Sequence, residues 1–413
     1  MSIKKFDLDI CFLSILYPPN CDAYDKQVKR HRGQNITSIQ LDIIEGLKNN
    51  NATDPWIINT LLVPLFPKGF KCPFVKKTEL KGPLQGVNHS FINCAFVHSS
   101  SLFYGAKIYL KRWARHDNNK TKVIIAYFLT SYTLSAMRFV KKVNPNIKTV
   151  IIVPDLPQFT YQNTNNPIIR FKNTLGRYNV LKAIQRNALS VDGWLLFSEK
   201  MLEKLPFCKK YMVFEGIATD LFKGISPKRL VDNTKIEILD AGGLNENYGL
   251  LLLLEAFSKI ADPNYRLILA GRGNVENEIV SAAAEDSRIM FLGEIPRNEL
   301  LALELGADLL VNPRVNSGHF TKYSFPSKNM EYLSSGTAML GYKLDGIPGE
   351  YSAYISYFEK PTAENLAQTI MDLCSEKSDN ATEKARLAKD FVSQNKSKDV
   401  WGYRILQFIE SLN

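Results

Sequence analysis

The sequence predicts an α/β protein built from two doubly wound domains that face each other across a cleft. Short apolar runs alternate with amphipathic segments along the chain, and the alternation begins again near residue 222. The apolar runs are continuous, which is typical of parallel strands that helices cover on both faces. The length of 413 residues also favours two or three domains.

The first half of the chain predicts one domain, at residues 1–214. Its expected strands are short apolar runs, at 8–16, 56–64, 91–97, 122–129, 149–154 and 193–198. Its expected helices lie between them, at 36–49, 100–115, 131–143, 170–190 and near 199–205. We interpret the first apolar run as a core strand and not a signal peptide, because Asp7 and Asp9 interrupt it.

The second half predicts a domain at residues 215–395, with 215–229 as its connection to the first. Its expected strands lie at 235–243, 265–273, 288–293, 307–314 and 338–343. Its expected helices lie at 249–260, 274–285, 296–305, 362–375 and 380–393. A third segment, 396–413, ends the chain in an amphipathic helix at 399–413.

The charge of the chain is divided unequally. Residues 1–210 hold 31 Lys and Arg against 13 Asp and Glu, whereas residues 211–413 hold 21 against 28. The excess of cations can simply serve solubility, or it can meet an anionic partner. Nucleic acid is not expected, because no zinc finger, RNP run or Arg-rich arm appears. An anionic membrane surface is favoured, because clusters at 26–32 and 111–115 place Val28 and Trp113 among cations.

The cysteines and the lengths of the apolar runs indicate the cellular compartment of the protein. The six cysteines form no C-x-x-C pair and show no metal-ligand spacing, which favours reduced thiols in a cytosol. No apolar stretch approaches the roughly 20 residues needed to span a bilayer. The sequence therefore predicts a cytoplasmic protein, and its basic half suits a peripheral position on the inner membrane face.

Residues 322–340, "KYSFPSKNMEYLSSGTAML", predict a short helix that binds an anion. Ser324 can cap the helix, Pro326 suits its first turn, and Ser335-Gly336 can end it. The free N–H groups near Ser327 and Lys328, together with the Lys328 ammonium, would attract a phosphate. A carboxylate so close to a phosphate makes sense if Glu331 accepts hydrogen bonds from sugar hydroxyls. The alternative is an exposed Lys–Glu pair of small energy.

Two glycine-bearing strand ends would lie near the same place. "AGG" at 241–243 and "GRG" at 271–273 each follow an expected strand. Ligands of open parallel sheets bind at the carboxyl ends of strands, and glycine lets the backbone approach a phosphate. Tight turns also need glycine, so each motif alone is a weak signal.

The segment "FPSKNMEYLSSGTAML" resembles the donor site of retaining glycosyltransferases of family 4, which share the GT-B fold of two Rossmann-like domains. Four further runs resemble successive landmarks of that family: "EGIATDLF", "LILAGRG", "RIMFLGEIPRNEL" and "ADLLVNPR". The resemblance covers about 190–345. Residues 1–190 match in layout only, through "VPDLPQF" (153–159) and the helix start at Gly33-Gln34. Many members of this subset build bacterial surface polysaccharides.

The resemblance implies transfer of a sugar from a nucleotide-diphosphate donor, with UDP as one candidate carrier, to a glycan or lipid-linked acceptor. Capsule or exopolysaccharide synthesis and a hexosyltransferase activity would fit. It also implies retention of anomeric configuration by front-face substitution, with no obligatory metal and no other cofactor. The departing phosphate oxygen would take the acceptor proton. The first domain would bind the acceptor, and the last helix would cross back onto it.

Residue by residue, Glu331 matches the Glu that usually holds the donor ribose. Tyr323 stands where a second Glu, which contacts the donor sugar, is expected. The family's diphosphate-binding Arg and Lys correspond here to Gly243 and about Tyr248. Because a diphosphate leaving group needs cations, we expect Lys328, helped by Arg272 or Arg314, to supply them.

The predicted site residues come from both domains. Asp155 stands where relatives carry a His that contacts the donor sugar; it can also be a loop cap. Lys328, Glu331, Asp155 and Arg272 are the predicted catalytic residues. The predicted donor-binding residues are Gly243, Gly271, Arg272, Arg314, Tyr323, Ser324, Phe325, Pro326, Ser327, Lys328 and Glu331. Gly33 and Gln34 would contact phosphate or acceptor from the first domain.

Other classes of function stay open at this stage. Asp7-Leu8-Asp9 resembles a metal-binding D-x-D, but it stands at the start of a strand, so no metal site is expected there. A sugar-nucleotide epimerase shares the fold and binds a similar donor. The departures at Gly243, Tyr248 and Tyr323 would also suit a non-catalytic nucleotide-sugar-binding partner of another transferase. A dinucleotide oxidoreductase is not expected, because neither glycine run completes G-x-G-x-x-G.

Overall fold

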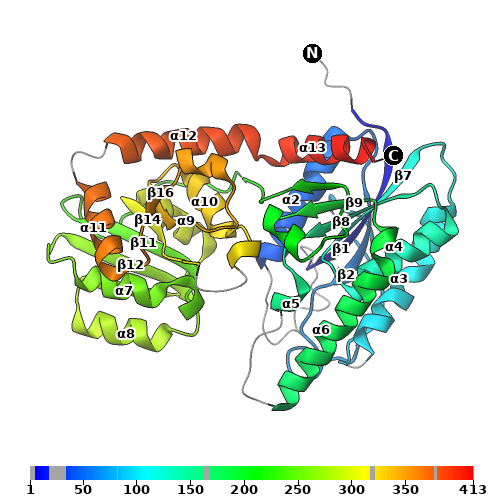
Figure 1. Ribbon diagram of the computed structural model, residues 1–413, viewed down its shortest axis with the longest axis horizontal. Coiled ribbons are helices and arrows are strands. Elements are labelled where there is room, and N and C mark those ends of the chain that lie inside the picture. The colour runs from blue at the N-terminus through cyan, green and yellow to red at the C-terminus, as the bar shows by residue number, and fades with distance from the viewer. Residues whose placement is uncertain are drawn as a thin grey trace. The chain divides into compact units, whose positions relative to one another are not determined.

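The computed structural model describes residues 5–17, 34–80, 82–95, 97–160, 167–218, 220–316, 321–375 and 379–412. The chain forms two compact units (Figure 1). Unit 1 comprises residues 1–217 and 398–413, and unit 2 comprises residues 218–397. The boundaries expected from the sequence, after residues 214 and 395, lie two or three residues before these.

Unit 1 is built around a sheet with the strand order β10-β9-β8-β7-β1-β2-β5-β4. Its neighbouring strands pair in parallel, except that β4 runs antiparallel to β5. The strands are β1 (Leu8–Leu16), β2 (Trp56–Leu61), β4 (Thr78–Glu79), β5 (Gln85–Asn88), β7 (Thr121–Tyr127), β8 (Lys148–Val153), β9 (Gly193–Leu196) and β10 (Tyr211–Val213). The chain winds outward from β1 in both directions, which is the doubly wound arrangement.

Helices cover this sheet. They are α2 (Gln34–Asn50), α3 (His98–Arg115), α4 (Ser131–Val143), α5 (Pro157–Thr160), α6 (Pro167–Asn187) and α13 (Lys398–Glu410). The last helix, α13, packs closely on α2, because a Cβ at Gly402 would lie 2.1 Å from the Gly46 carbonyl oxygen. The two glycines therefore fix the place where the C-terminal helix joins unit 1.

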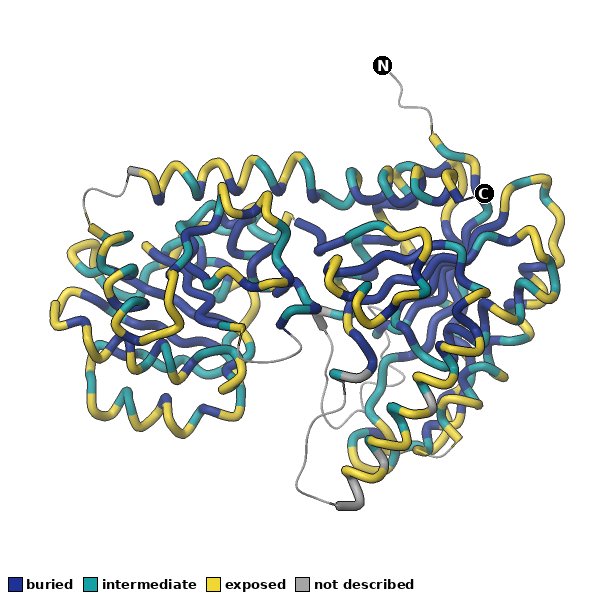
Figure 2. Tube along the Cα trace, viewed as in Figure 1, coloured by how far each residue is buried: buried dark blue, intermediate teal, exposed yellow. Residues whose placement is uncertain are grey.

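Unit 2 has a parallel sheet with the order β13-β12-β11-β14-β15-β16. Its strands are β11 (Ile236–Gly243), β12 (Tyr265–Arg272), β13 (Ile289–Gly293), β14 (Leu309–Asn312), β15 (Met339–Tyr342) and β16 (Ser356–Phe358). Its helices are α7 (Leu250–Ser258), α8 (Glu276–Glu285), α9 (Arg297–Gly306), α10 (Ser327–Ser335), α11 (Ala363–Cys374) and α12 (Asp379–Asn395). Successive strand residues enter different apolar clusters, Ile238 and Leu267 on one face and Leu239 and Ile268 on the other. The strands are thus buried on both sides (Figure 2).

Some expected elements differ from those observed. The expected strand at 91–97 is wrong: only Phe91–Ile92 form a strand, β6, which pairs with β3 (Phe74–Val75) apart from the main sheet. The chain then turns, because the N–H groups of Val97 and His98 donate to the Cys94 carbonyl and begin α3. The expected helix near 199–205 is a short 3-10 turn, Glu199–Glu203. Among the described residues, no helix has both the length and the apolar character needed to cross a bilayer.

Candidate functional site

The candidate site lies in unit 2, where the direction of strand order reverses. From β11 the chain goes to β12 and β13 on one side and to β14, β15 and β16 on the other. In open parallel sheets, the crevice at the carboxyl ends of the two strands beside such a reversal is the usual ligand site. Here these strands are β11, which ends in Gly242-Gly243, and β14, which leads to Arg314 and α10.

Helix α10 begins one residue after Pro326, whose backbone (φ −66°, ψ 117°) makes it the N-cap. The expected N-cap at Ser324 is wrong, because the N-cap position belongs to Pro326, two residues later, whose side chain makes no capping hydrogen bond. Phe325 is buried against Tyr351, with ring centroids 5.0 Å apart, so its ring anchors the helix in the core. Gly336, at φ 78°, ends the helix as expected.

One face of α10 is fixed to the sheet by three polar contacts. Lys328 Nζ lies 2.5 Å from Asp240 Oδ1, on β11. Asn329 Oδ1 accepts a hydrogen bond from Asn312 Nδ2 of β14, at 2.6 Å. Tyr332 Oη accepts the Ala241 N–H, at 2.9 Å. The start of α10 is therefore held against the ends of the two central strands.

Asp240, the partner of Lys328, was not predicted from the sequence. Its side chain is fully buried, and Oδ2 has no hydrogen-bond partner among the described residues. Burial raises the pKa of Asp240, and the nearby Lys328 ammonium opposes that rise. The pair places Lys328 beside the strand end, where a Cβ on Gly242 would lie 3.6 Å from Lys328 Cε. Asp240 is thus a positioning group for the Lys328 cation.

A second cation reaches the same strand end through an aromatic ring. The Arg314 guanidinium lies 4.2 Å from the ring centroid of Tyr248. The same ring lies against Gly243, because a Cβ there would be 3.0 Å from Tyr248 Cε2. Tyr248 stands near the position where the family 4 resemblance leads one to expect a lysine. Arg314 therefore brings a positive charge to the position that lacks that lysine.

Glu331 lies on another side of α10 and is held by α9. Its carboxylate accepts two hydrogen bonds from the Arg297 guanidinium, one of them 2.9 Å long. Burial lowers the pKa of Arg297, but the hydrogen bond and charge of Glu331 outweigh this and raise it. Glu304, also on α9, is fully buried, and neither of its carboxyl oxygens has a hydrogen-bond partner among the described residues. Burial, and then the charge of Glu331, raise the pKa of Glu304 well above 4.5.

This environment predicts a pH-dependent stability. A carboxyl group whose folded pKa is raised binds a proton more readily in the folded state, so its contribution is present at low pH and is lost as pH rises. The free energy of unfolding should therefore fall as pH rises above 4.5 through the raised pKa of Glu304. Glu304→Gln, which cannot ionise, should remove this fall and raise the melting temperature at neutral pH. Melting curves over a pH series test this, and parallel curves for the two proteins would contradict it.

The other predicted residues of unit 2 have distinct places. Arg272, at the end of β12, forms an exposed ion pair with Glu294, with Nε and Oε2 2.7 Å apart. Gly271 has φ 137° and touches β11 so closely that a Cβ would lie 1.8 Å from the Gly242 carbonyl oxygen. Tyr323 is buried in a short 3-10 turn before α10. Of the predicted residues, Lys328, Arg314 and Gly243 thus lie at the end of β11, with Gly242 beside them, whereas Arg272 forms an ion pair on the surface.

Three predicted residues belong to unit 1. Asp155 is exposed in the loop after β8. Gln34 is the first residue of α2, although its side chain lies outside the described part. Gly33 lies outside the described residues. The contacts of these three residues with a donor or acceptor stay predictions.

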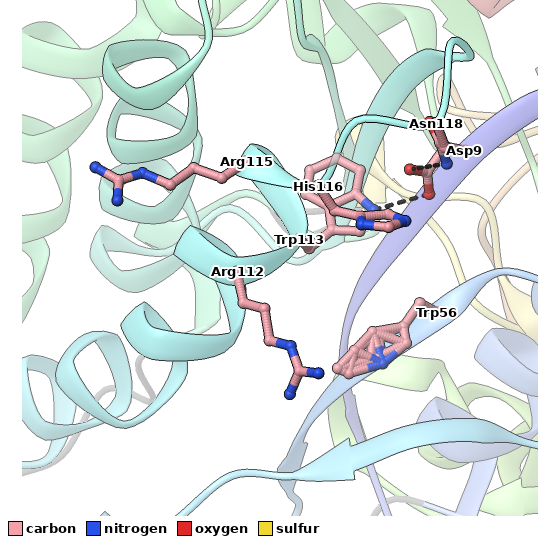
Figure 3. Close-up of a pocket in the computed structure, with 7 residues that line it drawn as sticks. All are labelled: Asp9, Trp56, Arg112, Trp113, Arg115, His116 and Asn118. Carbon is pink, nitrogen blue, oxygen red and sulfur yellow. Dashed lines mark hydrogen bonds between the residues drawn. The ribbon is translucent and has the colours of Figure 1, made fainter.

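An open hollow of about 680 Å³ lies in unit 1, at the amino-terminal ends of the interior strands β1 and β2 (Figure 3). It is lined by Asp9, Trp56, Arg112, Trp113, Arg115, His116 and Asn118. Asp9 accepts hydrogen bonds from Trp113 Nε1 (2.9 Å) and Asn118 Nδ2 (2.8 Å) and pairs with Lys122. The Trp113 indole is buried, so the expectation that it meets a membrane interface is wrong.

Both aspartates of the D-x-D pattern form ion pairs with lysine side chains. Asp7 Oδ1 lies 2.6 Å from Lys120 Nζ, while Asp9 pairs with Lys122. Burial raises the pKa of Asp9, but the hydrogen bonds from Lys122, Trp113 and Asn118 outweigh it and lower the pKa. Across the described part of the chain, no three His, Cys, Asp or Glu side chains gather as a metal site requires.

Comparison with known proteins bears directly on this site. Residues 223–390 match the family model of the glycosyl transferases, group 1. The matched segment contains the candidate site: Asp240, Gly242, Gly243, Tyr248, Arg314, Lys328 and Glu331. No curated protein sequence matches the chain.

Solved structures resemble the whole chain at low sequence identity. Sucrose-phosphate synthase from Thermosynechococcus elongatus has a TM-score of 0.62 and 16% identity, over 99% of each chain. A glycosyltransferase from Rickettsia africae has a TM-score of 0.62 and 14% identity, over 99% of each chain. The Anabaena protein HepE, in complex with UDP, has a TM-score of 0.58 and 13% identity, over 98% of this chain and 100% of that one. At these identities the likeness shows the fold, which is the α/β fold of GT-B glycosyltransferases.

Proposed function

We propose that the protein is a retaining glycosyltransferase that moves a sugar from a nucleotide-diphosphate sugar to a glycan or glycolipid acceptor. The observation that carries the proposal is the pair of cations at the end of β11. Lys328 lies beside Gly242, and Arg314 reaches Gly243 through the Tyr248 ring. Two cations beside a glycine strand end, with a helix N-terminus facing it, suit a diphosphate. The match of residues 223–390 to group 1 glycosyl transferases supports the same chemistry.

The residues of unit 2 would act on the leaving group. As the bond from the sugar to the diphosphate breaks, negative charge grows on the phosphate oxygen, and Lys328 and Arg314 stabilise it. That oxygen takes the proton of the acceptor hydroxyl, which attacks the same face of the sugar, so configuration is retained. Glu331, oriented by Arg297, accepts hydrogen bonds from the ribose hydroxyls of the donor. The reaction has no obligatory metal, because these cations take the place of one.

The donor class is the next part of the proposal. The Anabaena protein HepE is described with UDP, and an E. coli trehalose-6-phosphate protein with UDP-2-fluoro glucose. We therefore expect a UDP-sugar as the first donor to test. Asp155 is the proposed contact of unit 1 with the donor sugar, and a lipid-linked acceptor in cell-surface or capsular glycan synthesis suits the basic charge of residues 1–210.

The role of Arg314 predicts a rescue. Arg314→Ala should weaken binding of the nucleoside diphosphate by roughly 10- to 100-fold, because charge-assisted hydrogen bonds are lost. Adding Tyr248→Lys to that variant should restore part of the affinity, because it returns a cation beside Gly243. Isothermal titration at a temperature where both proteins are folded measures this. Unchanged affinity in Arg314→Ala would contradict the assignment.

Transfer itself is tested by donor consumption with the full chain. UDP-, GDP-, dTDP- and ADP-sugars are incubated with and without acceptor glycans, and proton NMR of the product reports the anomer. Product with the anomeric configuration of the donor supports the proposal, and an inverted product contradicts retention. Conversion of donor to another sugar nucleotide without acceptor would indicate an epimerase. Tight nucleotide binding without any turnover would indicate a non-catalytic partner.

A further inference from the structure

Helix α6 exposes an apolar stripe to solvent. Phe171, Leu175, Tyr178 and Leu181 are 70%, 50%, 57% and 45% exposed, and their spacing places them on one side of the helix. The helix packs on α4 through other positions, of which Ile184 is buried. Most described residues of α6 are exposed or half-buried (Figure 2). Clustered exposed apolar residues of this size are uncommon on a surface that meets only water.

Basic side chains lie beside the apolar stripe on α6, and the helix carries no acidic residue. Arg170, Lys182 and Arg186 are exposed on α6, and Lys182 Nζ lies 5.4 Å from the centroid of the Tyr178 ring. The chain has no acidic residue between Asp155 and Asp192. The electrostatic potential around the stripe is therefore positive.

The same combination recurs on α3, which contacts α4 on the side away from α6 (Figure 1). Tyr104 and Ile108 are 69% and 68% exposed, one helical turn apart, and Lys111 follows on the same side. Between Glu79 and Asp192 the chain holds 16 Lys and Arg against two acids, Asp117 and Asp155. The exposed apolar residues thus stand in a broad region of positive charge.

We infer that the outer face of α6, assisted by that of α3, docks on an anionic lipid bilayer. Aromatic and aliphatic side chains flanked by Lys and Arg suit a helix lying in the headgroup region, where the rings enter and the cations meet lipid phosphates. A protein partner fits less well, because the positive charge extends over α3 as well as α6 with only two acids between Glu79 and Asp192, and a bilayer offers an anionic surface of that breadth. The inference rests on the proposed function in one respect: membrane docking would give the enzyme access to a lipid-linked acceptor.

Co-sedimentation of the full chain with vesicles tests the inference. Wild-type protein should bind vesicles of phosphatidylcholine with phosphatidylglycerol, bind vesicles of phosphatidylcholine alone weakly, and be released by salt. Phe171→Ser/Leu175→Ser/Tyr178→Ser should reduce binding to the level seen with neutral vesicles. Arg170→Gln/Lys182→Gln/Arg186→Gln should weaken binding by roughly fivefold for each cation removed.

A matched control replaces exposed apolar residues of unit 2. Leu251→Ser/Val280→Ser/Leu387→Ser removes three apolar side chains that are 39%, 54% and 39% exposed, and it should bind vesicles like wild type. The melting temperature and its shift by nucleotide should be unchanged in both α6 variants, which separates this inference from the donor site. Vesicle binding that is absent from wild type, or unaffected in both α6 variants, would overturn it. A wild-type dimer that the serine variant converts to monomer would also overturn it, because a second copy would then cover the face.

Discussion

Lys328→Met is expected to lower the turnover number on the order of 10²- to 10³-fold, the usual cost of losing one group that stabilises transition-state charge. It should also destabilise the fold by about 3–5 kcal/mol, because it leaves the buried Asp240 carboxylate without its partner. The loss of stability should diminish at lower pH, since Asp240 then takes up a proton. Steady-state kinetics and urea unfolding of the variant measure the two effects.

A second substitution separates the two roles of Lys328. Lys328→Met/Asp240→Asn has no buried charge left unpaired, so it should recover most of the lost stability while turnover stays low. Lys360→Met, at an exposed lysine of the same unit, is the control and should behave like wild type. Recovery of turnover in the double variant would mean that Lys328 only serves the fold.

Gly271→Ala is expected to destabilise unit 2 by more than about 3 kcal/mol, because the added Cβ meets the backbone of β11 in a conformation that L side chains rarely adopt. Gly242 and Gly271 pair across the two strands, and the Cβ would lie 1.8 Å from the Gly242 carbonyl oxygen. The clash should also displace Gly242-Gly243 and weaken donor binding.

Gly293→Ala provides the comparison for that prediction. Gly293 also has a positive φ, 62°, but a Cβ there would meet nothing within 4 Å. Its replacement should cost only about 1–2 kcal/mol, the backbone penalty alone. The difference between the two free energies of unfolding then contains the clash between β11 and β12, together with the unlike backbone penalties of φ 137° at Gly271 and φ 62° at Gly293. Equal costs would contradict the close approach of these strands at the site.

Local sequence patterns predicted most of the fold because its strands are continuous apolar runs. The helices of unit 2 were also predicted from local sequence patterns. In unit 1, helix α4 has the expected bounds, 131–143. The strands that escaped prediction are short or carry glycine, such as β5 (Gln85–Asn88) and β16 (Ser356–Phe358). Their pairing is decided by neighbouring strands and leaves little trace in their own residues.

The contacts of the candidate site could be predicted only in part, because the residues that form them are far apart in the chain. Lys328 was found from its place at a helix start, but its partner Asp240 is 88 residues away. One signal was present: an acid inside a strand expected to be buried on both faces needs a partner. The stacking of Arg314 on Tyr248 gave no such signal, since neither residue is unusual in its own segment.

The exposed apolar stripe of α6 could not be predicted from the sequence, for a different reason. Its apolar residues lie on two sides of the helix, one packed on α4 and one exposed, so the pattern did not mark an amphipathic stripe. Only the packing shows which side is left to solvent. The charge asymmetry of the chain was visible in the sequence. In the 111–115 cluster, however, only the cations are exposed, whereas the Trp113 indole is buried and donates to Asp9.

The measurement that tests the central claim most directly is a thermal-shift screen of wild-type, Lys328→Met/Asp240→Asn and Arg314→Ala proteins. UDP, GDP, dTDP and ADP and their sugars are each added to all three. At a hundred times its dissociation constant, the matching nucleotide should stabilise wild type by about 2.7 kcal/mol. That shift should shrink or vanish in both variants. A shift of equal size in all three proteins, or no shift with any nucleotide on folded wild type, would contradict a diphosphate site at the end of β11.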